Sequence, residues 1–90
     1  MYSRGMVDDK TRMLCVVGDW IAVRDAEHAG THMRGALKAG ASAREIIEVV
    51  LQSAVYFGMP AGNEALKIFI KILEEKGRLD EIGNLVPYGD

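Results

Sequence analysis

The helical spacing of the apolar side chains constrains the fold of this chain more than any other feature. In four successive stretches these side chains recur every three or four residues, the period of an amphipathic α-helix. The spacing predicts helices over about residues 9–23, 25–40, 42–57 and 60–76, and residues 78–83 could add one more turn. Short connections then predict an all-α fold, a compact bundle of about four to five helices in a single domain over residues 1–90.

Residues that start and stop helices separate these stretches. Asp25 suits the N-cap of the second helix, and Gly40 suits a left-handed position at its end. Ser42 and Glu45 form the pattern of a capping box, and Pro60 suits the first turn of the fourth helix. Outside these helices we expect an extended lead-in over residues 1–7 and an irregular tail over residues 84–90.

The third stretch is the most apolar part of the chain. Its β-branched run over residues 46–50 could indicate a strand, but the capping box and the length of the stretch favour a helix. Since this helix is apolar over much of its circumference, we expect it to be central and buried. In the first stretch, Gly18 costs about 1 kcal/mol relative to alanine, so we expect close packing against a neighbour there.

The charge and hydropathy pattern excludes several classes of function. The chain has 11 basic and 13 acidic residues, well mixed along its length, and no basic block that would suit nucleic acid. Its apolar runs are far shorter than the roughly 20 residues that span a bilayer, and residues 1–5 lack the apolar stretch of a signal peptide. We therefore expect no nucleic-acid partner, no membrane association and a cytoplasmic location.

Cys15 is the only cysteine, which excludes a disulfide within the chain. We expect it to be a small buried side chain of the first helix. A chain of 90 residues buries only roughly two-thirds of the surface that it exposes when unfolded, yet 49% of its residues are hydrophobic. Because small cores are often supported by metals or self-association, we expect a homo-oligomer.

His28 and His32 are the only histidines, and their spacing places them on one helical face. This spacing could support metal binding, but Glu27 lies roughly 100° off that face and no further ligand stands out, so we expect no metal. Histidine can instead exchange protons with a substrate near neutral pH. Alternatively, His32 is a structural histidine whose ring nitrogen meets a backbone carbonyl, while His28 and Glu27 form a solvated first turn.

Two further side chains are candidates for ligand binding. Arg12 could bind an anion near the start of the first helix, although a surface salt bridge is the commoner role for such a residue. Tyr56, near the end of the third helix, could hydrogen-bond a ligand or a neighbouring subunit.

The segment from Thr11 to about Gly77 resembles the carboxymuconolactone decarboxylase family. The resemblance is carried, in order, by residues 10–12, 32–40, 43–56 and 58–63. It implies a helical bundle that assembles into trimers or hexamers, with active sites near the subunit contacts.

The family has a thiol branch that is alkylhydroperoxidase-D-like. Its members use a Cys-x-x-Cys pair, a histidine four residues later and a glutamate in the preceding helix. With His32 as that histidine, the cysteine positions hold Asp25 and His28, and the glutamate position holds Met13. Because both the peroxidatic and the resolving thiol are missing, we expect no peroxidase activity of this type. One alternative is a family member that carries a peroxiredoxin label but lacks the Cys-x-x-Cys pair and its activity.

His32 also matches the histidine of the His-x-Arg motif in the decarboxylase branch. The resemblance implies a cofactor-free lyase that releases carbon dioxide from a small carboxylated lactone or a related acid. In that reaction His32 would donate the proton, Arg12 or Arg34 would hold a carboxylate, and Glu27 or His28 would orient His32 or assist it. A non-catalytic oligomeric module is the other alternative.

The sequence also departs from the decarboxylase branch at two points. The branch carries a helical region before its Thr-Arg motif that helps to close the pocket, and this sequence lacks that region. It also carries an acidic residue at the position of His28, next to which this chain has Glu27.

Overall fold

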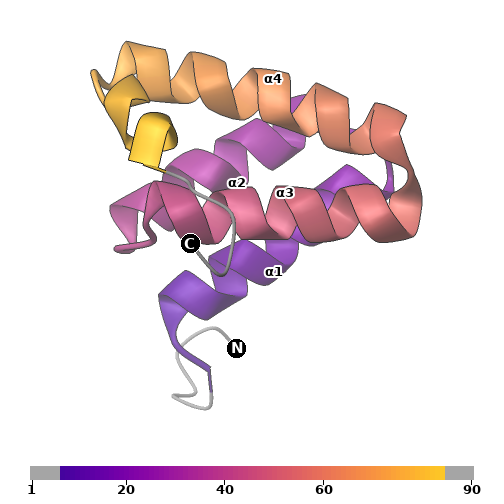
Figure 1. Cartoon of the computed structure of the whole chain (residues 1–90). Helices are drawn as coiled ribbons and strands as arrows, with labels where there is room; N and C mark the ends of the chain where they lie inside the picture. The colour runs from indigo at the N-terminus through magenta and orange to yellow at the C-terminus, as the bar shows by residue number, and fades with distance from the viewer. Residues whose placement is uncertain (1–6, 85–90) are drawn as a thin grey trace.

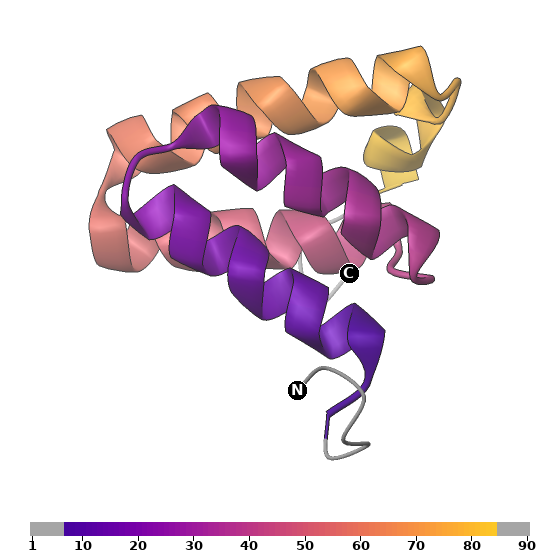
Figure 2. The same cartoon turned by 180° about the vertical axis from the view of Figure 1, so that it is seen from behind.

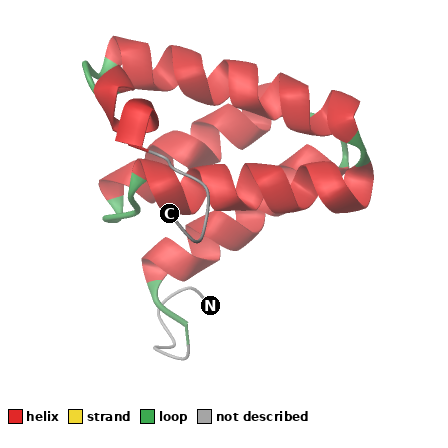
Figure 3. Cartoon of the chain, viewed as in Figure 1, coloured by secondary structure: helices red, strands yellow, loops and turns green. Residues whose placement is uncertain are grey.

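The computed structural model of the chain describes residues 7–84, and the side chains of residues 7–81. Four α-helices are followed by a short 3-10 helix (Figure 1): α1 (Asp9–Ala22), α2 (Ala26–Lys38), α3 (Ala43–Phe57), α4 (Met59–Glu75) and η2 (Leu79–Asn84). The described residues contain no strand (Figure 3), so the predicted all-α fold is confirmed. Nearly all of the expected lead-in and tail lies outside the described residues.

The helices form two antiparallel hairpins that pack against each other. Helix α1 packs most extensively on α2, and α3 packs most extensively on α4. The hairpins meet along two further seams, α2 against α4 and α1 against α3, while the α1/α4 and α2/α3 pairs make few contacts. Seen from behind, α1 and α2 lie side by side in front of α3 and α4 (Figure 2).

Side-chain caps begin three of the helices, and the sequence predicts those of α2 and α3. The Asp8 carboxylate accepts a backbone N–H in the first turn of α1, and the Asp25 carboxylate does the same in α2. At the start of α3, Ser42 and Glu45 form a complete capping box. These bonds satisfy N–H groups that a helix leaves without partners at its N-terminus.

A residue with positive φ follows each of the four α-helices. Arg24, Gly40, Gly58 and Gly77 follow α1, α2, α3 and α4 with φ angles of 64°, 104°, 100° and 69°. Arg24 is unusual because a side chain costs about 1–2 kcal/mol in this backbone region. Its guanidinium binds the carboxylate of Glu64 on α4 through two hydrogen bonds of 2.9 and 2.8 Å.

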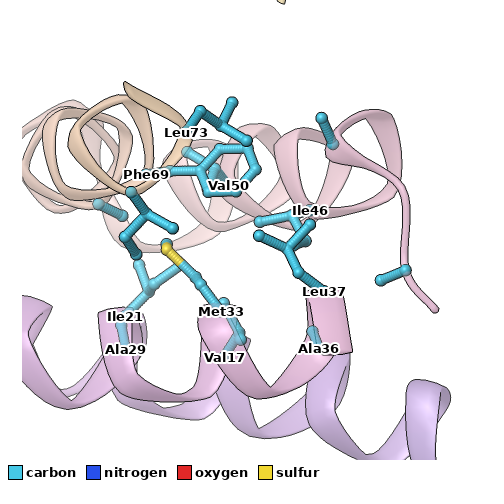
Figure 4. Packing of buried hydrophobic residues seen from close by; sticks show 14 of the residues in the cluster. Val17, Ile21, Ala29, Met33, Ala36, Leu37, Ile46, Val50, Phe69 and Leu73 are labelled. Carbon is cyan, nitrogen blue, oxygen red and sulfur yellow. The ribbon is translucent and has the colours of Figure 1, made fainter. Parts of the chain in front are cut away.

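The core lies between the two hairpins. Ile21 of α1 and Met33 of α2 point toward Phe69 of α4, with Val50 of α3 beside it (Figure 4). The expectation of a central, buried helix holds for only part of α3. Ala43, Ile46 and Val50 are buried, but apolar side chains of the last two turns are exposed: Leu51 by 56%, Val55 by 79%, Tyr56 by 74% and Phe57 by 51%.

Two glycines show how closely the helices approach. A Cβ atom at Gly62 of α4 would lie 2.5 Å from Cβ and 3.2 Å from Cα of Ala54 on α3, so this contact requires glycine. At Gly18 a Cβ would lie 3.6 Å from Cγ1 of Val49, which is an ordinary contact. The predicted close packing at Gly18 is therefore wrong.

Candidate functional site

A pocket between α1 and α2 brings Arg12 and His32 together. It has a volume of about 290 Å³ and is lined by Asp9, Arg12, Met13, Val16 and His32. The four residues from α1 share one helical face because they are spaced by three and four positions. His32 enters from α2, which the short connection after α1 folds back along that face.

The His32 ring is anchored by a backbone hydrogen bond. Its Nδ1 lies 3.0 Å from the carbonyl oxygen of His28, one turn earlier in α2. A carbonyl oxygen can only accept, so Nδ1 carries the hydrogen and Nε2 is the nitrogen that gains or loses a proton. His32 thus makes the backbone hydrogen bond expected of a structural histidine. Its side chain also lines the pocket.

His28 lies outside this pocket and is held by Asp25. Its Nδ1 is 2.8 Å from Oδ2 of Asp25, whose Oδ1 also accepts the backbone N–H of His28 at 3.0 Å. The backbone bond and then the ring of His28 lower the pKa of Asp25 below its ordinary value. The side chain of His28 is 56% exposed.

Trp20 contacts both histidines, although no sequence pattern singled it out. Its ring stacks on His28 with 4.5 Å between the ring centroids, and it lies near-parallel to His32 at 6.2 Å. A signal was available: Trp20 is near the end of the first helix and His28 near the start of the second. In a hairpin with a short connection, such positions lie side by side.

Glu27 and Arg34 lie on another face of α2. Both line a shallow pocket against α4 that does not include His32. Nη2 of Arg34 lies 2.5 Å from Oε1 of Glu75, and this hydrogen bond lowers the pKa of the Glu75 carboxyl. The structure therefore does not bring either residue to the Arg12–His32 pocket.

Tyr56 lines a different pocket, a groove of about 400 Å³ between α1 and α3. Its hydroxyl is not part of the Arg12–His32 pocket. Cys15 lies in the same groove and is exposed, so the expectation of a buried thiol is wrong. Residues from both helices line the groove: Thr11, Leu14, Cys15, Gly18, Asp19, Ala22, Val49, Gln52, Ser53, Tyr56 and Phe57.

The part of the chain that the structure describes has neither a metal-ligand cluster nor a membrane-spanning helix. Among residues 7–81, no group of three or more histidine, cysteine, aspartate or glutamate side chains could hold a metal ion. In the same part of the chain, no helix is long and apolar enough to cross a bilayer. The cytoplasmic location stays a prediction from the sequence.

The Arg12–His32 pocket combines groups that suit a small acid. Arg12 provides a cation, and its Nε donates to the carbonyl oxygen of Val7 at 3.1 Å. Met13 and Val16 provide an apolar wall beside these polar groups. His32 can transfer a proton through Nε2. The carboxylate of Asp9 adds one negative charge to the lining.

Comparisons with known proteins identify the chain's relatives. Residues 1–71 match the model of the carboxymuconolactone decarboxylase family. The chain is 35% identical over 75 residues to nitrosuccinic acid decarboxylase from Metarhizium robertsii, which covers 83% of this chain and 52% of that protein. It is 36% identical over 78 residues to an uncharacterized 15.0 kDa protein encoded between nqo9 and nqo10 in Paracoccus denitrificans, which covers 83% of this chain and 58% of that protein. The chain thus spans about half the length of these relatives. Because the match covers most of its residues, this protein belongs to the carboxymuconolactone decarboxylase family.

Proposed function

We propose that this protein is a decarboxylase of small organic acids, in which Arg12 binds a carboxylate and His32 donates a proton. The observation that carries the proposal is the pocket between α1 and α2 in which these two side chains meet. Membership of a decarboxylase family and the similarity to nitrosuccinic acid decarboxylase support it. Following the family resemblance, we propose that the reaction needs no cofactor.

The proposed reaction breaks the bond between a carbon atom and a carboxylate. Carbon dioxide leaves, and the electron pair stays on the carbon atom, where a neighbouring electron-withdrawing group delocalises it. The protonated Nε2 of His32 then delivers its proton to that carbon, and His32 regains a proton from water. Arg12 holds a second carboxylate of the same molecule, which fixes the substrate in the pocket.

The substrate class follows from these two roles. A fitting acid carries one carboxylate for Arg12, a second one that leaves, and an electron-withdrawing group next to the leaving carboxylate. A small carboxylated lactone meets this description, and so does nitrosuccinic acid, the acid named for the Metarhizium relative.

Substrate loss and carbon dioxide release with γ-carboxymuconolactone and nitrosuccinic acid test the proposal. We expect His32→Gln to lower kcat by about 10²–10⁴-fold, the usual contribution of a positioned acid. Arg12→Gln should raise KM, because it removes the charge that holds the carboxylate. Cys15→Ser, in the groove between α1 and α3, serves as the control and should keep the full rate. A rate no higher than that of buffer with either acid would reject the proposal.

We also propose that the partner of this protein is a second copy of the same chain, joined through the exposed end of α3. The surface consists of Leu51, Val55, Tyr56, Phe57 and Met59, each more than half exposed. Monomers rarely expose apolar patches of this kind.

The charge pattern favours a copy of the same chain as the occupant of this surface. Residues 49–63 contain no Asp, Glu, Lys, Arg or His. The centres of subunit interfaces are depleted of charge and enriched in aromatic residues and methionine, as this surface is. A second copy presents the same uncharged surface, so neither partner has to bury a charge against it. The family resemblance leads us to expect a trimer or a hexamer.

An oligomeric module without catalysis is the second candidate function. It would be favoured if neither of the acids above is turned over.

A further inference from the structure

An indole ring and two imidazole rings form a stacked group where α1 ends and α2 begins. The ring centroid of Trp20 lies 4.5 Å from that of His28 and 6.2 Å from that of His32, with interplanar angles of 22° and 24°. The backbone carbonyl of Trp20 also accepts the N–H of Asp25 at 3.0 Å. The backbone of Trp20 therefore helps to hold the turn between the helices, and its indole ring stacks on both imidazoles.

Both imidazoles have the same nitrogen engaged. Nδ1 of His32 meets the carbonyl oxygen of His28, and Nδ1 of His28 meets the ionised carboxylate of Asp25. Neither acceptor carries a hydrogen, so each Nδ1 must donate its own. In water the neutral imidazole prefers its hydrogen on Nε2. The structure therefore reverses that preference twice and leaves each Nε2 as the nitrogen that exchanges protons.

We propose that Trp20 and Asp25 are the positioning residues of the proton-transfer site. Asp25 sets the tautomer of His28, and the backbone carbonyl of His28 in turn holds Nδ1 of His32, which leaves Nε2 of His32 as the reactive nitrogen. Trp20 stacks on both imidazole rings and restricts their orientation. His32 remains the residue that touches the substrate, and Trp20 and Asp25 act through the histidines. The use of these nitrogens in catalysis rests on the proposed function, whereas the tautomers and the stacking do not.

Asp25 also caps α2, so its two roles must be separated by the choice of variant. Asp25→Ser keeps a side-chain oxygen for the backbone N–H of His28 but has no second oxygen for the imidazole. Trp20→Leu keeps an apolar side chain without a ring, and Trp20→Phe keeps a ring in the same place.

The experiment is NMR spectroscopy of the imidazole groups in ¹⁵N-labelled full-length protein, without substrate, at a pH where both rings are neutral. We expect both histidines to carry hydrogen on Nδ1. Asp25→Ser should return His28 to the Nε2–H form and leave His32 unchanged. Trp20→Leu should remove the ring-current shift from the ring protons of both histidines, more strongly for His28, and Trp20→Phe should retain part of it.

Each result decides one part of the inference. A wild-type His28 with hydrogen on Nε2, or an Asp25→Ser variant that keeps it on Nδ1, would overturn the role of Asp25. Unchanged ring-proton shifts in a folded Trp20→Leu variant would overturn the role of Trp20. Since no substrate is present, failure of decarboxylation would leave these results intact. Where an acid is turned over, Asp25→Ser should lower kcat and leave KM unchanged, because Asp25 holds His28, whose carbonyl oxygen anchors His32. An unchanged kcat would reject the link to catalysis.

Discussion

At Gly62, the absence of one methyl group sets how closely α3 and α4 approach. A Cβ atom there would meet Cβ and Cα of Ala54, and the backbone of α3 cannot yield cheaply. We expect Gly62→Ala to lower the free energy of unfolding by about 1–3 kcal/mol, measured by urea denaturation, because overpacking outweighs the gain in helix propensity.

Gly18→Ala is the matched control, since it makes the same change in the interior of a helix. The added methyl group would meet only an ordinary contact with Val49, so propensity should dominate. We expect a gain of up to about 1 kcal/mol in the free energy of unfolding. Equal effects of the two substitutions would contradict the packing difference between the two sites.

Arg24 combines an unfavourable backbone conformation with an ion pair to Glu64. Arg24→Ala and Arg24→Gly both remove the ion pair, but only glycine relaxes a φ of 64°. We expect the glycine variant to be more stable than the alanine variant by about 1 kcal/mol, measured by urea denaturation. Equal stability of the two variants would show that the backbone of Arg24 is not strained.

At the scale of the helices, the N-caps link stability to pH. Asp25 accepts two hydrogen bonds from His28, and its pKa lies below its ordinary value of 3.8. A lowered pKa means that the unfolded chain binds the proton more tightly. The stability that the carboxylate contributes is therefore present above about pH 4 and is lost as the pH falls below it.

Asp25→Asn tests this link, because asparagine caps a helix equally well but does not titrate. Circular dichroism at about pH 5 and about pH 3 would give Tm for both proteins. We expect wild-type protein to lose more Tm than the variant over this interval, since only the wild type has the Asp25 carboxylate to protonate. Parallel curves would show that Asp25 contributes nothing to acid unfolding.

The helices could be predicted because their signals are local. The capping box of Ser42 and Glu45 and the cap at Asp25 are short patterns whose physics acts within one turn. The burial of α3 could not be predicted in this way. Its apolar circumference does not tell which side meets the core and which side is left exposed, because tertiary packing decides that.

Only part of the candidate site could be predicted, because the site also depends on tertiary packing. His32 and Arg12 were expected to act together, and the structure places both in one pocket. Their approach, and the stacking of Trp20 on His28, depend on how α2 turns back along α1, which neither helix encodes by itself. Arg34 and Tyr56 lie in the stretches that carry the family resemblance, but they line other pockets. Neighbours in sequence face different sides of a helix.

At the scale of the whole molecule, the uncharged end of α3 predicts self-association. Val55 is 79% exposed on that surface, so a carboxylate there would have to be buried in the assembly. We expect Val55→Glu to shift an oligomer to monomers in sedimentation-velocity measurements at micromolar concentration.

Thr31→Glu provides the control, because it adds the same charge at an exposed position of α2. This variant should sediment like the wild type. A monomeric wild-type protein, or an oligomer that Val55→Glu leaves intact, would show that the end of α3 is not the interface.

The pairing of the helices has a consequence for how the chain reaches its native state. Because α1 packs mainly on α2 and α3 mainly on α4, most partners are close together along the chain. Proteins with such local contacts fold in microseconds to milliseconds, since little loop-closure entropy is lost before contacts form. We therefore expect each hairpin to condense on its own and the docking of the two halves to be the slower event. Only Gly58 separates α3 from α4, so the second hairpin has almost no connecting chain to order and is the better candidate to form first.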